Sequence, residues 1–384
     1  MFDQSGCWAI LYSANENNYH LTNNRAQMKF STFIAFPEMF MPKLSKPHVL
    51  LPVLCLLAGL LTSPLLAAEE VNVYSARKED LIKPLLDDFS KQTGITVNLV
   101  TGKEEALLQR LQSEGANTPA DVLLTSDAGR LAAARQAGVL QAVQSAALAK
   151  HIPAAYRDPE GYWYGLSVRA RPIIYAKDRV KSAQLSTYED LAVPQWRDKI
   201  CVRSSDSIYN QSLVAGMIAH HGEAKTEAWA KGLVANFARP PKGGDRDQIK
   251  AVAAGECDVT LANTYYLGGM VNSPDPAEQA AAAKVAVFWP DAKTTGVHVN
   301  VSGAGVTAHT HNRDNALKLL EFLASDLAQR WYADVNNEYP VNPAIPPSAT
   351  LESWGTFKAD TLNVAKLGEL NAAAVRLMDR AGWK

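Results

Sequence analysis

Short β-branched runs alternate with helical hydrophobic periods from Val71 onward, and this alternation limits the fold more than any other feature of the sequence. The runs VNVYS, ITVNLV and ADVLLTSD have the pattern of strands, and a segment of helical periodicity follows each one. Strands that alternate with helices of this length form right-handed βαβ units around a largely parallel sheet. We therefore expect an α/β fold.

The second half of the chain repeats this pattern. The strand KICVR precedes helices around QSLVAGMIAHH, from Glu223 to Asn236 and through DQIKAVAAGE, and the strand CDVTLA follows. Residues 121–125 and 258–262 resemble each other, and each segment ends in small polar residues where a helix begins. The sequence thus predicts two lobes, each a mainly parallel sheet flanked by helices, with ligand contacts at the carboxyl ends of the strands. Nucleotide-binding glycine motifs are absent from the sequence, so a nucleotide cofactor has no support.

The one long apolar run, at residues 49–68, has the features of a secretory signal peptide. Two lysines precede this run, and it ends in small residues before two glutamates. A transmembrane anchor is one alternative because the run is long enough to span a bilayer, and Cys55 leaves a lipoprotein as another. We expect cleavage after Ala67 or Ala68 and export to the periplasm. Residues 1–40 are Asn-rich and aperiodic, which indicates a start codon chosen too far upstream.

Removal of residues 1–68 changes the charge and the cysteine content of the chain. That segment carries four basic and three acidic residues, so 38 Lys plus Arg and 39 Asp plus Glu become 34 and 36, a net charge of −2. Such a chain lacks the cationic excess that binding to nucleic-acid phosphates requires, so we expect no nucleic-acid partner. The two remaining cysteines are Cys201 and Cys257. An even pair in an exported chain favours a disulfide, with two buried free thiols as the alternative.

Tyr265 and Tyr266 directly follow the strand CDVTLA, at the expected start of a helix. Adjacent tyrosines are unusual core residues at such a position, because each buried hydroxyl needs a hydrogen-bond partner. Two phenol oxygens at one loop can face a common cation, and a strongly polarising cation such as Fe³⁺ displaces their protons. Packing of the two rings against the core is the alternative interpretation.

From Val71 onward the chain resembles the periplasmic ferric iron-binding proteins of ABC transporters. The resemblance rests on VNVYSAR, ADVLLTSDAGRL, YWYGLSVRARPIIYAKD and, most specifically, KICVRSSDSIYNQSL, GECDVTLANTYYLGGM and GVHVNVSGAGV. It implies a two-lobed periplasmic-binding-protein fold of type II, in which the cleft between the lobes holds Fe³⁺. It also implies that the iron ligands are Tyr209, Tyr265 and Tyr266.

The same resemblance indicates what completes the iron site. Members of the family often supply a histidine or a tyrosine after the first strand, where this chain has Arg77, Lys78 and Glu79. Glu79 is the expected carboxylate ligand, and an acid that only favours a helix N-terminus is the alternative. Arg77 and Arg169 are expected to hold a small synergistic anion such as carbonate, because a guanidinium matches a planar oxyanion. Ordinary salt bridges are the alternative for both arginines.

Together these expectations describe a two-lobed receptor. Residues 69–168 and a return segment at about 290–325 form the first lobe, and residues 169–289 and about 326–384 form the second. The protein captures ferric iron, closes around it and delivers it to an inner-membrane ABC permease and its ATPase. We expect a monomer that catalyses no reaction. The alternatives are a receptor for a polyamine, a thiamine-like cation or a small oxyanion, and an enzyme built on the same scaffold.

Overall fold

The fold of residues 69–384 is given by a computed structural model. Residues 1–68 lie outside the described residues, and with them the predicted signal peptide, its upstream extension, Cys7 and Cys55. Within residues 69–384, the helices are too short or too polar to cross a membrane.

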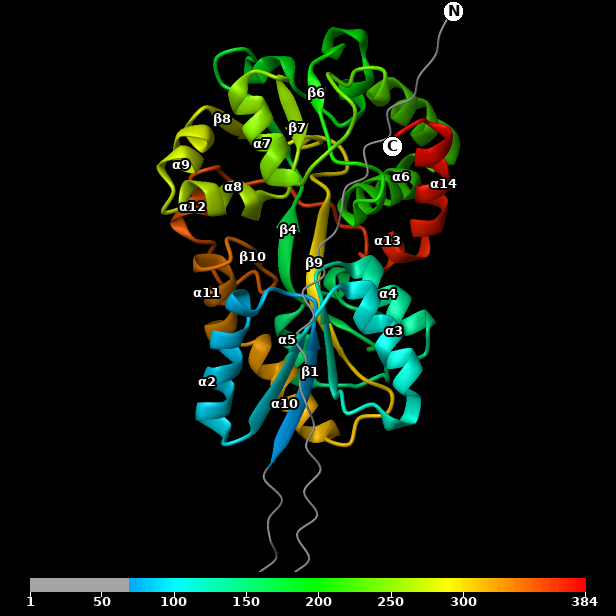
Figure 1. Ribbon diagram of the computed structural model, residues 1–384, viewed down its shortest axis with the longest axis vertical. Helices are drawn as coiled ribbons and strands as arrows, with labels where there is room; N and C mark the ends of the chain where they lie inside the picture. Colours follow the sequence, from blue (N-terminus) through cyan, green and yellow to red (C-terminus); the bar gives the residue numbers. More distant parts are fainter. Residues whose placement is uncertain (1–68) are drawn as a thin grey trace, which may run out of the picture. The chain divides into compact units, whose positions relative to one another are not determined.

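A six-stranded sheet with helices around it forms the first lobe (Figure 1). The strand order is β10-β4-β9-β3-β1-β2. The strands are β1 (Glu70–Ser75), β2 (Thr96–Thr101), β3 (Val122–Thr125), β4 (Tyr164–Ala170), β9 (Val299–Val306) and β10 (Tyr339–Pro340). The helices are α2 (Lys83–Thr93), α3 (Glu104–Glu114), α4 (Ala128–Gln136), α5 (Ala146–His151), α10 (Arg313–Leu323) and α11 (Asp326–Asp334). Short 3₁₀ helices are η1 (Glu79–Leu81), η2 (Gly115–Asn117) and η3 (Ala154–Tyr156).

A four-stranded sheet of order β6-β7-β5-β8 forms the second lobe. The strands are β5 (Ile173–Ala176), β6 (Ile200–Cys201), β7 (Val259–Leu261) and β8 (Val285–Phe288). The helices are α6 (Ile208–Val234), α7 (Asp245–Ala254), α8 (Thr264–Val271) and α9 (Pro276–Ala283), and later α12 (Ala349–Glu352) and α14 (Asn371–Arg380). Between them, α13 (Ala365–Glu369) packs against both α4 of the first lobe and α6 of the second. Three 3₁₀ helices lie between β5 and β6, namely η4 (Ser182–Gln184), η5 (Glu189–Ala192) and η6 (Pro194–Trp196).

Local sequence explains where the helices begin and end. In α2 the residues at helical spacing, Leu85, Leu86 and Phe89, are the buried ones. Gly94 ends α2 in the left-handed conformation, with a φ of 76°, which glycine adopts without steric cost. Within α6, Gly222 has a φ of 77° and a ψ of 161°, which are not helical, so two helices meet at this residue, as the sequence predicted.

The sheets are mixed, whereas the sequence predicted mainly parallel ones. The two-sheet α/β architecture is confirmed, and β1 pairs in parallel with β2 and β3, as β6 does with β7. The other pairs are antiparallel. The difference arises because β4 and β9 carry the chain from one sheet to the other without a crossover helix. Antiparallel pairs need no such helix, so these strands enter the first sheet in that direction.

β10 extends the sheet of the first lobe. It pairs with β4, with Tyr339 opposite Val168, and α11 packs against both strands. The lobe boundaries, with residues from about 326 in the second lobe, stay a prediction.

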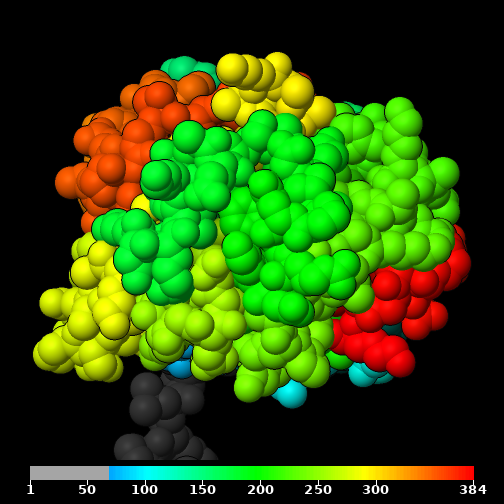
Figure 2. Space-filling view, turned by 90° about the horizontal axis from the view of Figure 1, so that it is seen from above, coloured from blue at the N-terminus to red at the C-terminus, as the bar shows by residue number. Residues whose placement is uncertain are grey.

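The C-terminal helix α14 packs against α6 of the second lobe. Its residues Leu377 and Met378 are completely buried, as their helical spacing requires. Seen from above, the red C-terminal residues lie at the flank of the green surface of the second lobe (Figure 2). The last helix of the chain therefore belongs to the second lobe, and it follows β10, the last strand of the first sheet.

Candidate metal centre

The structure brings the three predicted tyrosines together at one edge of the second sheet. Tyr209 is the second residue of α6, and Tyr265 and Tyr266 are the second and third residues of α8. These helices follow β6 and β7, which are parallel neighbours, so their carboxyl ends lie at the same edge. The rings of Tyr265 and Tyr266 have centroids 4.3 Å apart, and all three tyrosines are half-buried.

All three tyrosines line a cavity of about 520 Å³ between the lobes. Residues of the first lobe complete its wall, among them Arg77, Arg169 and Glu338. Both lobes thus contribute polar groups to one space, which is the arrangement expected of a cleft that closes on its ligand.

A close contact at Gly268 of α8 admits the side chain of Asn337, the neighbour of Glu338. A Cβ atom on Gly268 would lie 2.6 Å from the Cβ atom of Asn337, so only glycine permits this approach. The φ of Asn337 is 54°, a left-handed conformation that asparagine tolerates better than most residues. The glycine therefore lets a first-lobe segment reach the helix that carries the tyrosine pair.

Arg169 is a buried cation beside the tyrosines. Its guanidinium carbon lies 5.6 Å from the ring centre of Tyr265 and 5.8 Å from that of Tyr209. It is 3% exposed and donates one hydrogen bond to the Ser302 hydroxyl, at 2.8 Å. Burial alone would lower the pKa of Arg169, but the neighbouring acidic groups of Tyr265 and Glu338 outweigh burial and raise it, so the guanidinium stays charged.

The tyrosine pair does not ionise on its own at neutral pH. Burial raises the pKa of Tyr265 well above its ordinary value, and the neighbouring Tyr209 and Tyr266 raise it further, against the opposing charge of Arg169. Burial also raises the pKa of Tyr266, and Tyr209 adds to this shift. Metal ligands must lose their protons, so this cluster favours a cation that polarises the phenols strongly over one that does so weakly.

Arg77, predicted to bind an anion, is held by a carboxylate. Its Nη2 atom donates to Glu338 at 3.0 Å to Oε1 and 2.9 Å to Oε2. The Ser167 hydroxyl donates to the same carboxylate through a short hydrogen bond. Both ion-pair partners are buried, and both line the cavity. The salt-bridge alternative describes Arg77 in this structure, whereas Arg169 has no carboxylate within 4 Å among the described residues.

Glu79 is not brought together with the tyrosines. It is exposed in the first turn of η1, and it is not part of the cavity wall, although its neighbour Lys78 is. An acid at a helix N-terminus is favoured by the helix dipole, which was the alternative for this residue. Coordination of iron by Glu79 stays a prediction.

The predicted disulfide between Cys201 and Cys257 is confirmed, with Cα atoms 5.8 Å apart. It connects β6 to the turn that precedes β7. The tyrosines follow these two strands, so the disulfide joins the segments that lead to the cluster.

Sequence reasoning missed several residues around the tyrosines. Glu338 lies in a short segment without periodicity, and nothing local identifies it. Asp245, at the start of α7, lines the cavity and pairs with Arg171 at 3.0 Å. A signal did exist for Arg171, because Arg169 and Arg171 alternate in LSVRAR just before Pro172, where a strand has to end. Among residues 69–384 no group of three or more His, Cys, Asp or Glu side chains is arranged to hold a metal ion.

Comparison with known proteins gives consistent matches over most of the chain. The family model for bacterial extracellular solute-binding proteins matches residues 117–359. Iron uptake protein A1 of Synechocystis is 49% identical over 316 residues, which are 82% of this chain and 88% of the relative. The major ferric iron-binding protein of Neisseria meningitidis serogroup B is 28% identical over 334 residues, 86% of this chain and 98% of the relative.

A solved structure matches the fold closely. The Trichodesmium protein IdiA (FutA), determined with iron and citrate ligands, has a TM-score of 0.80 and 51% sequence identity. The match covers 82% of this chain and all of that one. The predicted two-lobed fold of type II is confirmed by this agreement.

Proposed function

Because the chain belongs to the family of bacterial extracellular solute-binding proteins, we propose that it is a periplasmic receptor for ferric iron, held by Tyr209, Tyr265 and Tyr266. The observation that supports this most is the convergence of the three phenols on one cavity between the lobes. The named relatives that span most of this chain are iron uptake and ferric iron-binding proteins, which agrees with the chemistry of the cluster.

Three phenolates carry three negative charges and neutralise one Fe³⁺ ion. The raised pKa values of Tyr265 and Tyr266 mean that these two phenols keep their protons until a strongly polarising cation displaces them. Fe³⁺ does this far better than divalent cations of similar size. The tyrosines thus favour ferric iron because a bound Fe³⁺ ion lowers the pKa of their phenols enough to release the protons.

A small synergistic anion such as carbonate completes the coordination, and Arg169 is its main partner in the cavity. Arg169 is buried, charged and bonded to one neutral hydroxyl, so its remaining donors are available to an oxyanion. Arg77 is already paired with Glu338, so it takes part only if an anion displaces that carboxylate. Glu79 serves as a further ligand only if closure brings η1 toward the tyrosines.

Family membership implies an ABC transporter as partner and the periplasm as location. We assign the finer steps as follows: the signal in residues 49–68 directs export, the monomer closes by bending of the crossing strands, and an inner-membrane permease with its ATPase receives the iron. The relatives are binding proteins, and we assign no catalysed reaction to this chain.

Titration of the purified protein with ferric nitrilotriacetate tests the proposal. Coordinated phenolates give an orange to purple charge-transfer colour, so the protein is expected to develop a visible band that saturates at one iron per chain. Changing Tyr265 and Tyr266 to Phe is expected to weaken this band and the affinity together.

The matched control is Tyr175→Phe, because Tyr175 lies on β5 of the same lobe, outside the cavity wall. This variant is expected to bind iron as the unchanged protein does. A colourless protein whose melting temperature ignores Fe³⁺ but rises with a polyamine, a thiamine-like cation or an oxyanion would refute the iron proposal in favour of that ligand.

A further inference from the structure

Arg171 lies in the short connection between the two sheets. β4 of the first sheet ends at Ala170 and β5 of the second begins at Ile173. The N–H of Arg171 donates to the carbonyl of His298 at 3.0 Å, and its carbonyl accepts from the Tyr188 hydroxyl at 2.8 Å. The backbone of Arg171 is therefore fixed at the point where the chain passes between the lobes, and its side chain is 1% exposed.

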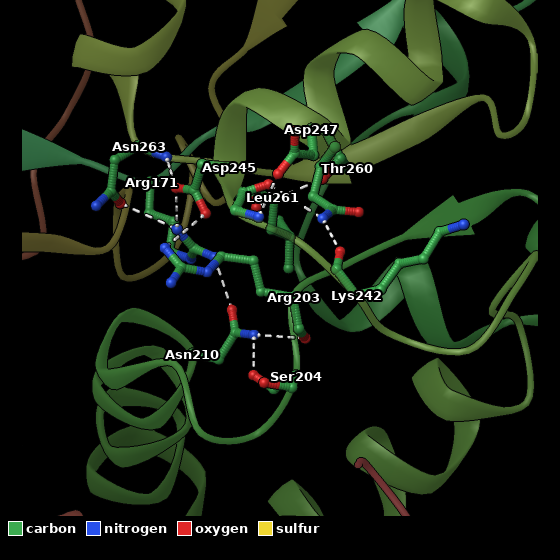
Figure 3. Close-up of polar contacts among 12 residues, drawn as sticks. Arg171, Arg203, Ser204, Asn210, Lys242, Asp245, Asp247, Thr260, Leu261 and Asn263 are labelled. Atoms are coloured by element: carbon green, nitrogen blue, oxygen red, sulfur yellow. Dashed lines mark hydrogen bonds and ion pairs between the residues drawn. The ribbon is translucent and has the colours of Figure 1, made fainter. Parts of the chain in front are cut away.

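The guanidinium of Arg171 bonds to three side chains of the second lobe (Figure 3). Its Nη1 atom donates to Oδ2 of Asp245 at 3.0 Å and to Oδ1 of Asn263 at 3.1 Å. Its Nη2 atom donates to Oδ1 of Asn210 at 2.6 Å. All three partners are buried. The planar fork thus sets the spacing of three acceptors that come from three separate segments.

Two of these partners adjoin the tyrosines. Asn210 directly follows Tyr209, and its amide nitrogen donates to the carbonyls of Arg203 and Ser204, at 3.0 and 3.1 Å. Asn210 therefore connects the loop before α6 to Arg171. Arg203 and Ser204 precede Tyr209 and Asn210 follows it, so these contacts restrain the chain on both sides of Tyr209.

Asn263 connects the tyrosine pair to Arg171 in the same way. It is the N-cap residue of α8, and it precedes Tyr265 by two positions. Its side chain makes no capping hydrogen bond and accepts from Arg171 instead. The backbone N–H of Asn263 also donates to Asp245 Oδ2, at 2.8 Å. The start of α8 is therefore bonded to both members of the Arg171–Asp245 ion pair.

Arg171 lies behind the tyrosines and not in the cavity wall. Its guanidinium carbon is 6.0 Å from the ring centre of Tyr209, and the 520 Å³ cavity does not include it. A buried ion pair contributes little net stability, but a network whose members bond to one another fixes one geometry. The contacts of Arg171 therefore fix the relative positions of the segments that carry the tyrosines.

We infer that Arg171 is a positioning residue of the iron site. It holds the first turn of α6, which carries Tyr209, at a fixed distance from the first turn of α8, which carries Tyr265 and Tyr266. The three phenol oxygens then face one point before iron arrives. This inference rests on the proposed function. It also gives the crossing between the lobes a direct connection to the site.

Three variants test the inference: Arg171→Gln, Arg171→Lys and the control Arg179→Gln. Arg179 also bonds to carboxylates, those of Asp178 and Asp258, and to two backbone carbonyls of the second lobe, but it is not part of the cavity wall. Affinity for ferric iron is measured by competition with EDTA, and the charge-transfer band is recorded per bound iron. Circular dichroism shows whether each variant is folded.

Arg171→Gln is expected to weaken the affinity roughly 10- to 100-fold, as loss of a group that orients metal ligands does. Its band is expected to be weaker and shifted, because fewer phenolates reach the same ion. Arg171→Lys is expected to recover part of both, since an ammonium keeps the charge but cannot span three acceptors in one plane. Arg179→Gln is expected to leave both unchanged.

An Arg171→Gln protein with the original affinity and band would overturn the inference, as would an equal loss in Arg179→Gln. If Arg171→Gln does not fold, Arg171→Lys decides: the original affinity and band overturn the inference, and a weaker affinity with an altered band supports it. An unchanged protein that shows no ferric band refutes the proposed function, and the inference with it.

Discussion

The Cys201–Cys257 disulfide joins the two strands that lead to the tyrosines, so its removal is expected to affect stability and iron binding together. The change is the double variant Cys201→Ala and Cys257→Ala. Both cysteines are buried, and alanine avoids placing a hydroxyl in their apolar surroundings. The two positions are 56 residues apart, and Tyr209 lies between them.

The size of the effect follows from that separation. A crosslink that closes a loop of this length removes chain entropy from the unfolded state and stabilises by about 4 kcal/mol at 25 °C. With an unfolding entropy of about 2.1 cal/mol/K per residue over residues 69–384, each kcal/mol corresponds to roughly 1.5 °C in melting temperature, so the double variant is expected to melt roughly 6 °C lower. Its iron affinity is expected to fall as well, because the separation of β6 and β7 is less firmly fixed.

Urea unfolding followed by tryptophan fluorescence measures the change in the free energy of unfolding, and EDTA competition measures the affinity. The control is reductant, which is expected to lower the stability of the original protein and to leave the double variant unchanged. A loss below about 1 kcal/mol would contradict the chain-entropy argument. An unchanged iron affinity would show that the strand pairing alone fixes the cluster.

Three further outcomes are expected from other parts of the structure. Arg77→Met leaves Glu338 buried without its cation and is expected to destabilise by about 3–5 kcal/mol in urea unfolding, and a loss within 0.5 kcal/mol, about the usual effect of a surface change, would contradict this. Burial raises the pKa of Asp127 from its ordinary value of 3.8 to about 7, so between these pH values the folded protein keeps a proton that the unfolded chain releases. Stability is therefore expected to fall by up to about 4 kcal/mol as pH rises through that window, and a slope that persists in Asp127→Asn would refute the assignment. Gly268→Ala places a methyl group against Asn337 and is expected to cost about 1–3 kcal/mol; an unchanged melting curve would show that the Asn337 segment moves aside freely.

The tyrosine pair was accessible from the sequence because its signal is local. Tyr265 and Tyr266 are adjacent, and they directly follow a recognisable strand. Tyr209 was predicted from the resemblance to ferric iron-binding proteins, and the structure places it near the pair because β6 and β7 are parallel neighbours whose carboxyl ends lie at one edge. The structure brings these residues together as expected.

The rest of the site depends on contacts between distant positions. Glu338 pairs with Arg77 across 261 positions, and no periodicity marks the segment that carries it. Glu79 and Lys78 are neighbours in sequence, yet only Lys78 lines the cavity, because the direction of a side chain in a single helical turn is set by packing. Local sequence patterns reveal neither which distant residues pair nor where a side chain points in a single helical turn.

The direction of β4 and β9, the strands that connect the two sheets, was also not predictable from local sequence. β4 and β9 are buried along their entire length, so they lack the alternation of apolar and polar residues that identifies a half-buried strand. Their antiparallel pairing follows from where the chain turns back, which depends on the whole topology. The prediction of mainly parallel sheets extended the pattern of the first three strands too far.

The position of β9 between β3 and β4 determines when the first lobe can form during synthesis. β9 spans Val299–Val306, so the centre of the six-stranded sheet is missing until about four-fifths of the chain has been made. Long-range pairing of this kind is slow to form, and domains generally fold as units. A ribosome-bound or partly translocated chain therefore has no complete first sheet, and folding waits for the last part of the polypeptide.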